Sequence, residues 1–550
     1  MLVNAQVNSD TSRIIQIVTA RSMRMMTLNN GGTIQMLAGN AIVRQGQTTL
    51  SGDSIAFNPA TGIAEVFGNV HINDADSVHT YAQYLRYIGA ERIAYLKRNV
   101  KFTDGKGTLF TNELEYNLQT GVANYKNGGR VVNGSTVLTS RDAVYYSDTK
   151  DVYFKKNVHL TDPKYDITAD SLLYNTQIKT ATFISPTHII SKSGVINTRS
   201  GTYNLETGEA LFYDQTEFSD STHFASGRTI AIDEKSGMVN IEGNGKLVDS
   251  VNKVIVLGDQ IFLDRKKNSF LATRKPIMIL YQKNDSTYIS ADTLFSGLRM
   301  YEKTEVRKVN KNTNTTKTTT TQATPFVTDS MQINSELKLS DTINIIKDSS
   351  VNISTANVSS PDSIRYFIAF HNVKIFNDSM QAVSDSLYYS TEDSVFRLFQ
   401  DPVFWNDKTQ VSGDTMYLFT ANKKPRQLNV FNNSLVINKP EDGIFNQVSG
   451  RTLNGYFIDG SIDNIRVKGS PAESVYYPQD EDSAYIGMNK SSGDVIDIFF
   501  INKELNKIKF VNNVNGTLYP IKQIPGELKL LKGFKWLDAR RPKNKLDLFL

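Results

Sequence analysis

The sequence predicts an all-β fold built from stacked, repeated units, and three observations support this fold class. A cassette of the form polar-x-apolar-x-apolar returns at a nearly fixed interval, and turn motifs rich in Asn, Asp and Gly separate the copies. No segment has a sustained helical period with caps. Repeats of this size stack on one another, because each unit is too small to bury its apolar face alone.

The cassettes locate the units along the chain. Their polar leading residues are Asp53, Gln83, Asn112, Arg141, Asp170, Arg199, Arg228, Asp259 and Asp292. Successive leading residues differ by 83 − 53 = 30, then by 29 five times, and then by 31 and 33. The apolar residues of a cassette stand two apart, which places them on one face of a strand.

Each cassette strand is followed by turn chemistry. In the motif from Asn58 to Gly62, the Asn side chain can bond its own backbone and the Gly accepts a positive φ. A short strand (64–67), a second turn at Gly68-Asn69 and another alternating strand (70–72) complete the unit. One unit is therefore expected to contain about three short strands.

The chain divides into five segments. Residues 1–35 are a lead-in whose start lacks a complete signal peptide and is compatible with the remnant of one. Residues 36–301 form the regular first array. Residues 302–365 are rich in Ser, Thr and Asn and predict a disordered insertion, because they cannot bury enough apolar surface to offset their ordering entropy. Residues 366–520 form a second, looser array, and residues 521–550 form a C-terminal cap or tail.

Composition excludes several classes of protein. With 39% hydrophobic and 21% charged residues, the chain of 550 residues is expected to fold. The absence of cysteine excludes disulfides, thiolate metal sites and thiol catalysis. A dispersed net charge of +5 is too weak for a nucleic-acid surface, and no apolar run is long enough for a transmembrane helix.

No catalytic constellation is found in the sequence. The six histidines lack ligand spacing, and the leading position of the cassette changes between acidic, neutral and basic residues. A position that changes its charge in this way is expected to be a solvated strand end rather than a general acid. We therefore predict that the protein is not an enzyme and needs no cofactor or metal.

The apolar faces of the cassettes form a stripe along the stack, which has two interpretations. The stripe can be ordinary core between packed sheets. Alternatively, the sheet is bent into an open V or jelly roll whose inner wall takes a ligand, which suits the many large aromatic residues of the stripe. The aromatic members are Phe57, Tyr87, Tyr116, Tyr145, Tyr174, Tyr203 and Tyr389.

Three stretches carry a resemblance to a known family: Gly68-Asn69-Val70-His71-Ile72, Ala169-Asp170-Ser171-Leu172-Leu173-Tyr174 and Ala291-Asp292-Thr293-Leu294. They resemble the OstA-like (organic solvent tolerance) proteins of lipopolysaccharide transport, which include the LptA-type periplasmic bridge protein. The layout is similar to the long form found in Bacteroidetes-type bacteria. Each motif is short, but nine copies in register are specific, and the likeness extends loosely into the second array.

The resemblance implies a bent antiparallel β-jelly roll, a taco-like stack of the repeated units, with an apolar interior groove. It implies a non-enzymatic periplasmic bridge, associated with the outer membrane, that shelters lipopolysaccharide acyl chains during transport. The implied partners are lipopolysaccharide, the inner- and outer-membrane transport components and further copies of the chain, end to end. The groove residues carried over by position are Ile55, Phe57, Leu85, Tyr87, Leu114, Tyr116, Leu172 and Tyr174, with Val70, Ile72, Val100, Phe102, Val158 and Leu160 on facing strands.

Two other functions fit the repeats. A structural or surface β-repeat protein that binds protein or glycan partners would have a closed core and would use its exposed faces. A parallel β-helix enzyme acting on carbohydrate would need carboxylates clustered on one side of the stack, which the changing leading residues do not supply.

Overall fold

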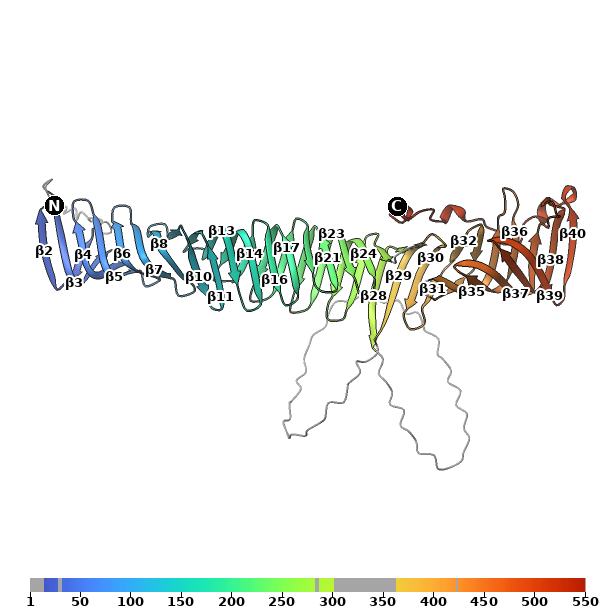
Figure 1. The fold of residues 1–550 in the computed structure, drawn as a ribbon, viewed down its shortest axis with the longest axis horizontal. Helices are drawn as coiled ribbons and strands as arrows, with labels where there is room; N and C mark the ends of the chain where they lie inside the picture. Colours follow the sequence, from blue (N-terminus) through green and yellow to red (C-terminus); the bar gives the residue numbers. More distant parts are fainter. Residues whose placement is uncertain (1–13, 28–31, 282–285, 301–362, 422–423, 550) are drawn as a thin grey trace, which may run out of the picture. The chain divides into compact units, whose positions relative to one another are not determined.

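The fold is all-β, as the sequence predicts. The computed structural model describes residues 14–27, 32–281, 286–300, 363–421 and 424–549. Their strands form one hydrogen-bonded network in which every paired strand is antiparallel to its neighbour (Figure 1). Residues 1–298 and 365–550 belong to one compact unit, which is the unit considered below. The expected insertion at 302–365 lies outside the described residues, except for its last three, which begin strand β29.

Long strands dominate the start of the first array, after two strands at its edge. The bounds are β1 Gln16–Thr19, β2 Ser22–Thr27, β3 Thr33–Gln45, β4 Thr48–Asn58, β5 Ile63–Asp74, β6 Val78–Ile88, β7 Ile93–Thr103 and β8 Thr108–Asn117.

Farther along the first array, some long strands are divided into two short ones. The bounds are β9 Val122–Tyr125, β10 Gly129–Asn133, β11 Thr136–Ser140, β12 Asp142–Tyr146, β13 Asp151–Thr161, β14 Tyr165–Asn175, β15 Thr180–Phe183, β16 Thr187–Ser191, β17 Gly194–Thr198, β18 Ser200–Asn204, β19 Glu209–Tyr213, β20 Thr216–Ser219, β21 His223–Gly227, β22 Thr229–Asp233, β23 Met238–Asp249, β24 Val254–Asp264, β25 Ser269–Thr273, β26 Ile277–Leu280, β27 Thr287–Ser290 and β28 Thr293–Met300.

The second array continues the same network, because β29 pairs with β27. Its strands are β29 Ser363–Phe376, β30 Gln381–Ser390, β31 Val395–Phe399, β32 Val403–Asn406, β33 Thr409–Ser412, β34 Thr415–Ala421, β35 Lys424–Asn438, β36 Asn446–Ile458, β37 Ser461–Tyr476, β38 Gly487–Ile501, β39 Glu504–Val511 and β40 Asn515–Pro520. Four 3-10 turns follow: η2 Ile521–Gln523, η3 Gly526–Leu528, η4 Asp538–Arg540 and η5 Lys545–Leu548.

Each long strand bends at a bulge, which corrects one detail of the sequence prediction. In β5, Phe67 pairs with Tyr84 and Val70 pairs with Ala82, so Gly68 and Asn69 together oppose one residue of β6. Both bulge residues have a positive φ. Two consecutive positive φ values are also typical of a hairpin turn, which is why the sequence suggested a turn here.

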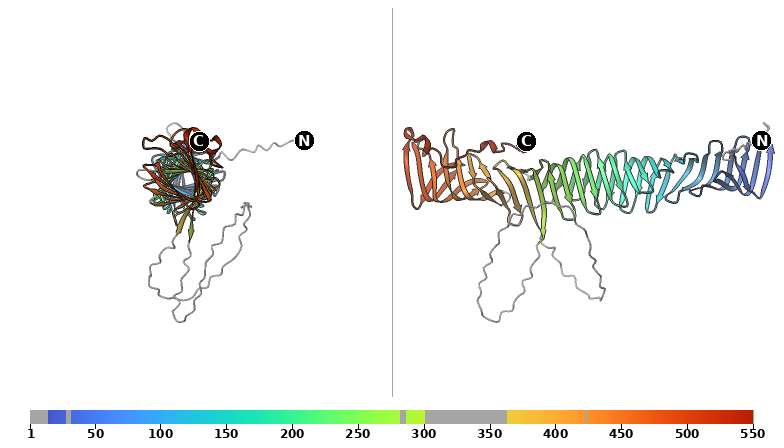
Figure 2. Two further views of the ribbon diagram at one scale, coloured as in Figure 1. Left: turned by 90° about the vertical axis from the view of Figure 1, so that its right-hand side faces the viewer. Right: turned by 180° about the vertical axis from the view of Figure 1, so that it is seen from behind.

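The bulge gives the repeat four strand segments instead of three, in two facing layers. We call the layer that holds the cassettes wall A (for example 53–58 and 63–67) and the layer beyond the bulge wall B (for example 70–74 and 78–82). The bulges of successive strands form the corner where the walls meet. In the end-on view of Figure 2, successive strands lie behind one another around a common interior.

The corner explains the form of the cassette. Its polar leading residue lies at the corner. Asp53 is in the middle of the long strand β4, whereas Arg141 lies between the short strands β11 and β12, at a strand end as expected. The Asp53 carboxylate accepts a bond of 3.1 Å from Nδ2 of Asn69. The residue before it is small because the corner is narrow. A Cβ added to Gly52 would lie 2.3 Å from Cγ1 of Val66.

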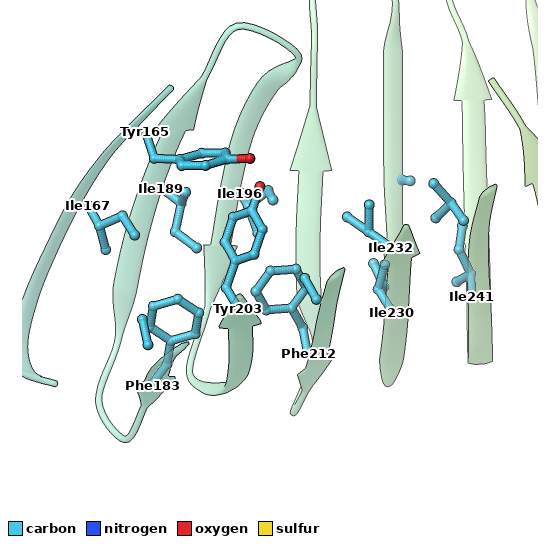
Figure 3. Packing of buried hydrophobic residues seen from close by; sticks show 14 of the residues in the cluster. Tyr165, Ile167, Phe183, Ile189, Ile196, Tyr203, Phe212, Ile230, Ile232 and Ile241 are labelled. Atoms are coloured by element: carbon cyan, nitrogen blue, oxygen red, sulfur yellow. The ribbon is translucent and has the colours of Figure 1, made fainter. Parts of the chain in front are cut away.

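One buried apolar cluster fills the space between the walls through both arrays. Figure 3 shows part of it, with Tyr165 and Ile189 of wall B facing Phe183 and Tyr203 of wall A. Gly201, which interrupts the leucine pattern of the cassettes, has a φ of 147°, and a Cβ there would lie 2.5 Å from the Leu211 carbonyl oxygen. Phe183 and Phe212, the cross-strand partners of Gly201, pack with ring centroids 6.0 Å apart and occupy the space of the missing leucine.

Candidate functional site

The fourteen residues predicted to line a groove lie together in the interior. All of them belong to the single apolar cluster between the walls, and the most exposed, Phe57, is 7% exposed. Wall A supplies Ile55, Phe57, Leu85, Tyr87, Leu114, Tyr116, Leu172 and Tyr174, and wall B supplies Val70, Ile72, Val100, Phe102, Val158 and Leu160. Cassette spacing and strand alternation therefore placed these side chains on the same continuous surface.

The two walls are in contact in this structure. The Phe102 ring of wall B lies edge-on to Tyr116 and Tyr145 of wall A, with centroid distances of 5.3 and 5.5 Å. A cavity of only about 30 Å³ remains beside these rings. The described state is a closed core, so a ligand can enter the interior here only if the walls separate.

Opposite the corner, the turns of the two walls meet along an edge that we call the mouth. Tyrosine hydroxyls of wall A donate there to side chains at the turns of wall B. Tyr87 donates to Oε1 of Gln45, Tyr116 donates to Oδ2 of Asp74 at 2.9 Å, and Tyr145 donates to Oδ2 of Asp104. The two partners of these bonds are 42, 42 and 41 residues apart in the sequence, so the same bond recurs from one unit to the next. We call this row the tyrosine seam.

Other polar groups extend the seam. Arg92 donates to Oγ1 of Thr48 at 3.3 Å, across the mouth. Farther along, the Tyr165 hydroxyl on wall B donates to Glu234 in a wall A turn at 2.6 Å. Tyr174 is an exception, because its buried hydroxyl has no hydrogen-bond partner in the part of the chain that the structure describes.

The environment of the seam keeps its tyrosine donors protonated and the Asp104 carboxyl charged. Burial and the neighbouring Asp74 carboxylate raise the pKa of Tyr116, and burial raises the pKa of Tyr165 to about 12. Burial alone would raise the pKa of Asp104, but bonds from the Tyr145 hydroxyl and from backbone amides hold it below its usual value. Phenol donors and carboxylate acceptors therefore face one another at neutral pH, where such bonds are strong.

The sequence analysis did not identify the acceptors of the seam. Gln45 and Asp74 are the last residues of β3 and β5, and Asp104 lies in the turn after β7. A signal was nevertheless present, because these residues share the period of the cassettes: 74 − 45 = 29 and 104 − 74 = 30. A polar residue at a turn that repeats in register with an inward-facing tyrosine predicts such a bond.

The outer face of wall B carries a broad polar hollow in the first array, with a volume of about 1490 Å³. Its lining includes His159, His188, Asn197, Arg199 and Arg228. In the described ranges, no group of three or more His, Asp or Glu side chains is placed to hold a metal ion. The same ranges contain no helix with the length and apolar character that a membrane crossing requires.

Comparison with protein-family models identifies the class of protein. Residues 13–170 match the OstA-like protein family, and residues 125–221 match the family described as lipopolysaccharide-assembly, LptC-related. The two matches overlap within the same repeats of the first array. A comparison with curated proteins finds no match.

These matches, which lie in the first array, support the resemblance of the chain to an OstA-like family of lipopolysaccharide-transport proteins. Members of the OstA-like and LptC-related families are non-enzymatic, periplasmic bridge proteins of this transport. The general role of the chain is therefore in lipopolysaccharide transport and outer-membrane biogenesis.

Proposed function

We propose that the protein shelters the acyl chains of lipopolysaccharide between walls A and B while the lipid passes toward the outer membrane. The observation that supports this most strongly is the continuity of the interior, in which one apolar cluster runs through both arrays. Each methylene moved from water into such an interior contributes about 0.8 kcal/mol. A lipid sliding along the stripe would exchange one apolar contact for the next without returning to water.

Loading requires the mouth to open, because the walls touch in the closed state. At the corner the walls are joined by continuous backbone, whereas at the mouth they are joined by side chains of the seam. Each such hydrogen bond contributes about 0.5 to 3 kcal/mol net. Burial of several lipid methylenes offsets the loss of one or two seam bonds, so local opening of the mouth is energetically feasible.

A cross-linking experiment tests this proposal. A photo-reactive phenylalanine derivative replaces Tyr174, whose hydroxyl has no bond to lose, and in a matched variant it replaces Lys179 in an exposed turn. Incubation with lipopolysaccharide should give cross-links at position 174 and none at 179. Equal labelling at both positions, or none at 174 in a folded variant, would contradict an interior path.

The two ends of the strand network suit end-to-end association, with another copy or with a membrane-anchored transport component. Among the described strands, β2 pairs only with β3, and β39 and β40 pair only with β38. β2 exposes Met23, Met25 and Met26, each by more than half. Unpaired apolar strand edges are templates for strand addition. Replacing Met25 with Lys should shift the chain toward the monomer in sedimentation experiments if this edge mediates association.

A second candidate function, binding of a glycan on the surface, is favoured by the polar hollow on wall B. Its histidine, asparagine and arginine side chains offer donors and acceptors suited to sugar hydroxyls. Replacing Asn197 and Arg199 together should abolish glycan binding and leave cross-linking at position 174 unchanged. Glycan binding that survives these changes would exclude the hollow as the site.

A further inference from the structure

The joint between the two arrays differs from the rest of the mouth. Up to Glu234 the seam closes the first array, and in the second array Asn406 of wall B donates to the Gly460 carbonyl of wall A at 3.1 Å. At the joint, three wall A residues bond to their own wall in the part of the chain that the structure describes. Arg365 bonds Ser296 and Asn268, Thr391 bonds the Arg365 backbone, and Thr420 bonds the Ser394 carbonyl.

A cavity of about 160 Å³ lies between the walls at this joint. Its deep surface is apolar and comes from both arrays, with Val254 and Leu280 from the first and Phe367, Met380 and Leu418 from the second. Apolar cavities of about 150 Å³ stay dry and take up small hydrocarbon ligands. The interior at the joint therefore has room for the end of an alkyl chain without any separation of the walls.

The rim of the cavity is polar, and among the residues that the structure describes it carries one cation, Arg365. Its guanidinium is half-buried and donates to Oγ of Ser296 at 3.1 Å and to Oδ1 of Asn268 at 2.9 Å. Among the described residues, no carboxylate lies within ion-pair distance of it. Burial lowers the pKa of Arg365, and Asp249 on the opposite wall acts on it only at longer range. An anion at the rim would compensate for this desolvated charge.

Arg92 shows what the same type of residue does elsewhere along the mouth. The amide of Leu118 donates to the Arg92 carbonyl, just as the amide of Thr391 donates to the Arg365 carbonyl, so the two arginines occupy equivalent positions. Arg92 reaches across to Thr48 and helps to close the mouth. Arg365 stays on wall A at the rim of the cavity, so its charge faces an opening rather than a closed seam.

We propose that the joint is a lateral binding site for an amphiphile with a phosphate headgroup, which inserts an alkyl chain into the cavity while Arg365 holds the phosphate. The inference rests on the proposed function, because it names where and by which groups a lipid would first engage the interior. Arginine presents donors in a fork that matches phosphate oxygens, and the threonines of the rim add further donors.

Calorimetric titration of the full chain with decyl phosphate, below its micelle concentration, tests the site. Wild type should bind decyl phosphate about tenfold more tightly than decanol, the ratio expected for one charge-assisted contact. Arg365→Gln should remove this difference, Arg365→Lys should retain part of it, and the matched control Arg92→Gln should leave it intact. Val254→Phe, which fills the cavity, should weaken both ligands. Inorganic phosphate alone should show no measurable binding.

Several outcomes would overturn the proposal. These are equal binding of decyl phosphate by wild type and Arg365→Gln, no discrimination between decyl phosphate and decanol, or binding of inorganic phosphate as tight as that of decyl phosphate. Cross-linking of lipopolysaccharide at position 174 separates this proposal from the general one. Cross-links at position 174 without phosphate binding would refute only the proposed site at the joint. A phosphate site without cross-links at 174 would refute only the interior path.

Discussion

The first and second arrays repeat the same cassette, but the outer face of wall B differs between them. In the first array this face is exposed to solvent, with side chains such as His159 and His188 around the hollow. In the second array it is apolar and buried, because the C-terminal tail (residues 521–549) lies over it. Figure 1 shows the tail running back from β40 toward β29.

The tail is held by apolar contacts and by a row of glutamines. Leu531 packs among Leu435 and Ile437, and Leu537 packs against Trp405. Gln410 accepts a bond from the Leu537 amide at 2.7 Å and donates to the Lys535 carbonyl at 2.8 Å. Gln447 does the same with Leu531 and Lys529, and Gln381 accepts from Arg541.

The comparison shows two ways to stabilise one repeat. The regular first array is closed by its seam and leaves wall B free, whereas the second array, whose intervals are less regular, gains a further layer. The tail also crosses the joint, since η5 contacts β27 and the Lys374 ammonium donates to the Asp547 carbonyl. The tail therefore also links the two arrays across the outer face of wall B.

Removing the tail should have the largest effect on the difference between the two arrays. A chain that ends at Pro520 would expose Trp405, Ile437 and their neighbours, at a cost of roughly 5 kcal/mol or more. Hydrogen exchange should then show lost protection in β32–β37 and unchanged protection in β4–β8. Equal loss in both arrays would mean that they unfold as one unit.

Breaking one glutamine contact should have a smaller effect in the same region. Gln410→Leu leaves the Lys535 carbonyl and the Leu537 amide without partners, which should lower the free energy of unfolding of the second array by about 2 to 3 kcal/mol. Gln119→Leu, in an exposed turn of the first array, is the matched control and should change it by less than about 0.5 kcal/mol. A similar loss for both variants in chemical denaturation would rule out a specific role for Gln410.

The seam of the first array can be tested with a pair of tyrosines. Tyr116→Phe removes the bond to Asp74 and should destabilise the first array by about 1 to 2 kcal/mol, as measured by exchange in β5–β8. Tyr174→Phe removes a hydroxyl without a partner and should be neutral or slightly stabilising. If the seam limits loading, Tyr116→Phe should also speed cross-linking of lipopolysaccharide at position 174. Equal stability of the two variants would show that the seam contributes little.

The smallest expected effect is a dependence on pH in the part of the first array around Asp104. The pKa of Asp104 is lowered in the folded state, so its contribution to stability is complete above its ordinary value of 3.8 and is lost as the pH falls through the folded pKa. Exchange in β7–β12 should therefore rise in acid, and Asp104→Asn should flatten that rise. A rise of the same size in the variant would assign it to other carboxylates.

Much of the candidate site follows from the pattern of the chain. Alternation within each cassette places Leu172 and Tyr174 on one face, and the fixed interval places that face at the same position on every unit. The division into walls was harder to predict, because a bulge with positive φ values at Gly68 and Asn69 resembles a turn. The bonds of the seam were missed because their partners lie 41 or 42 residues apart and belong to different units.

The sequence by itself determined the all-β class, the repeating unit and the side chains that face the interior, since all of these depend on residues close together in the chain. Only the tertiary structure decided that the walls close on each other at the mouth, that the tail covers wall B of the second array, and that Arg365 lies at an open joint. These features depend on which surfaces meet after the strands have stacked. That outcome is set by the bend at each corner and by packing between distant segments, and no local pattern records it.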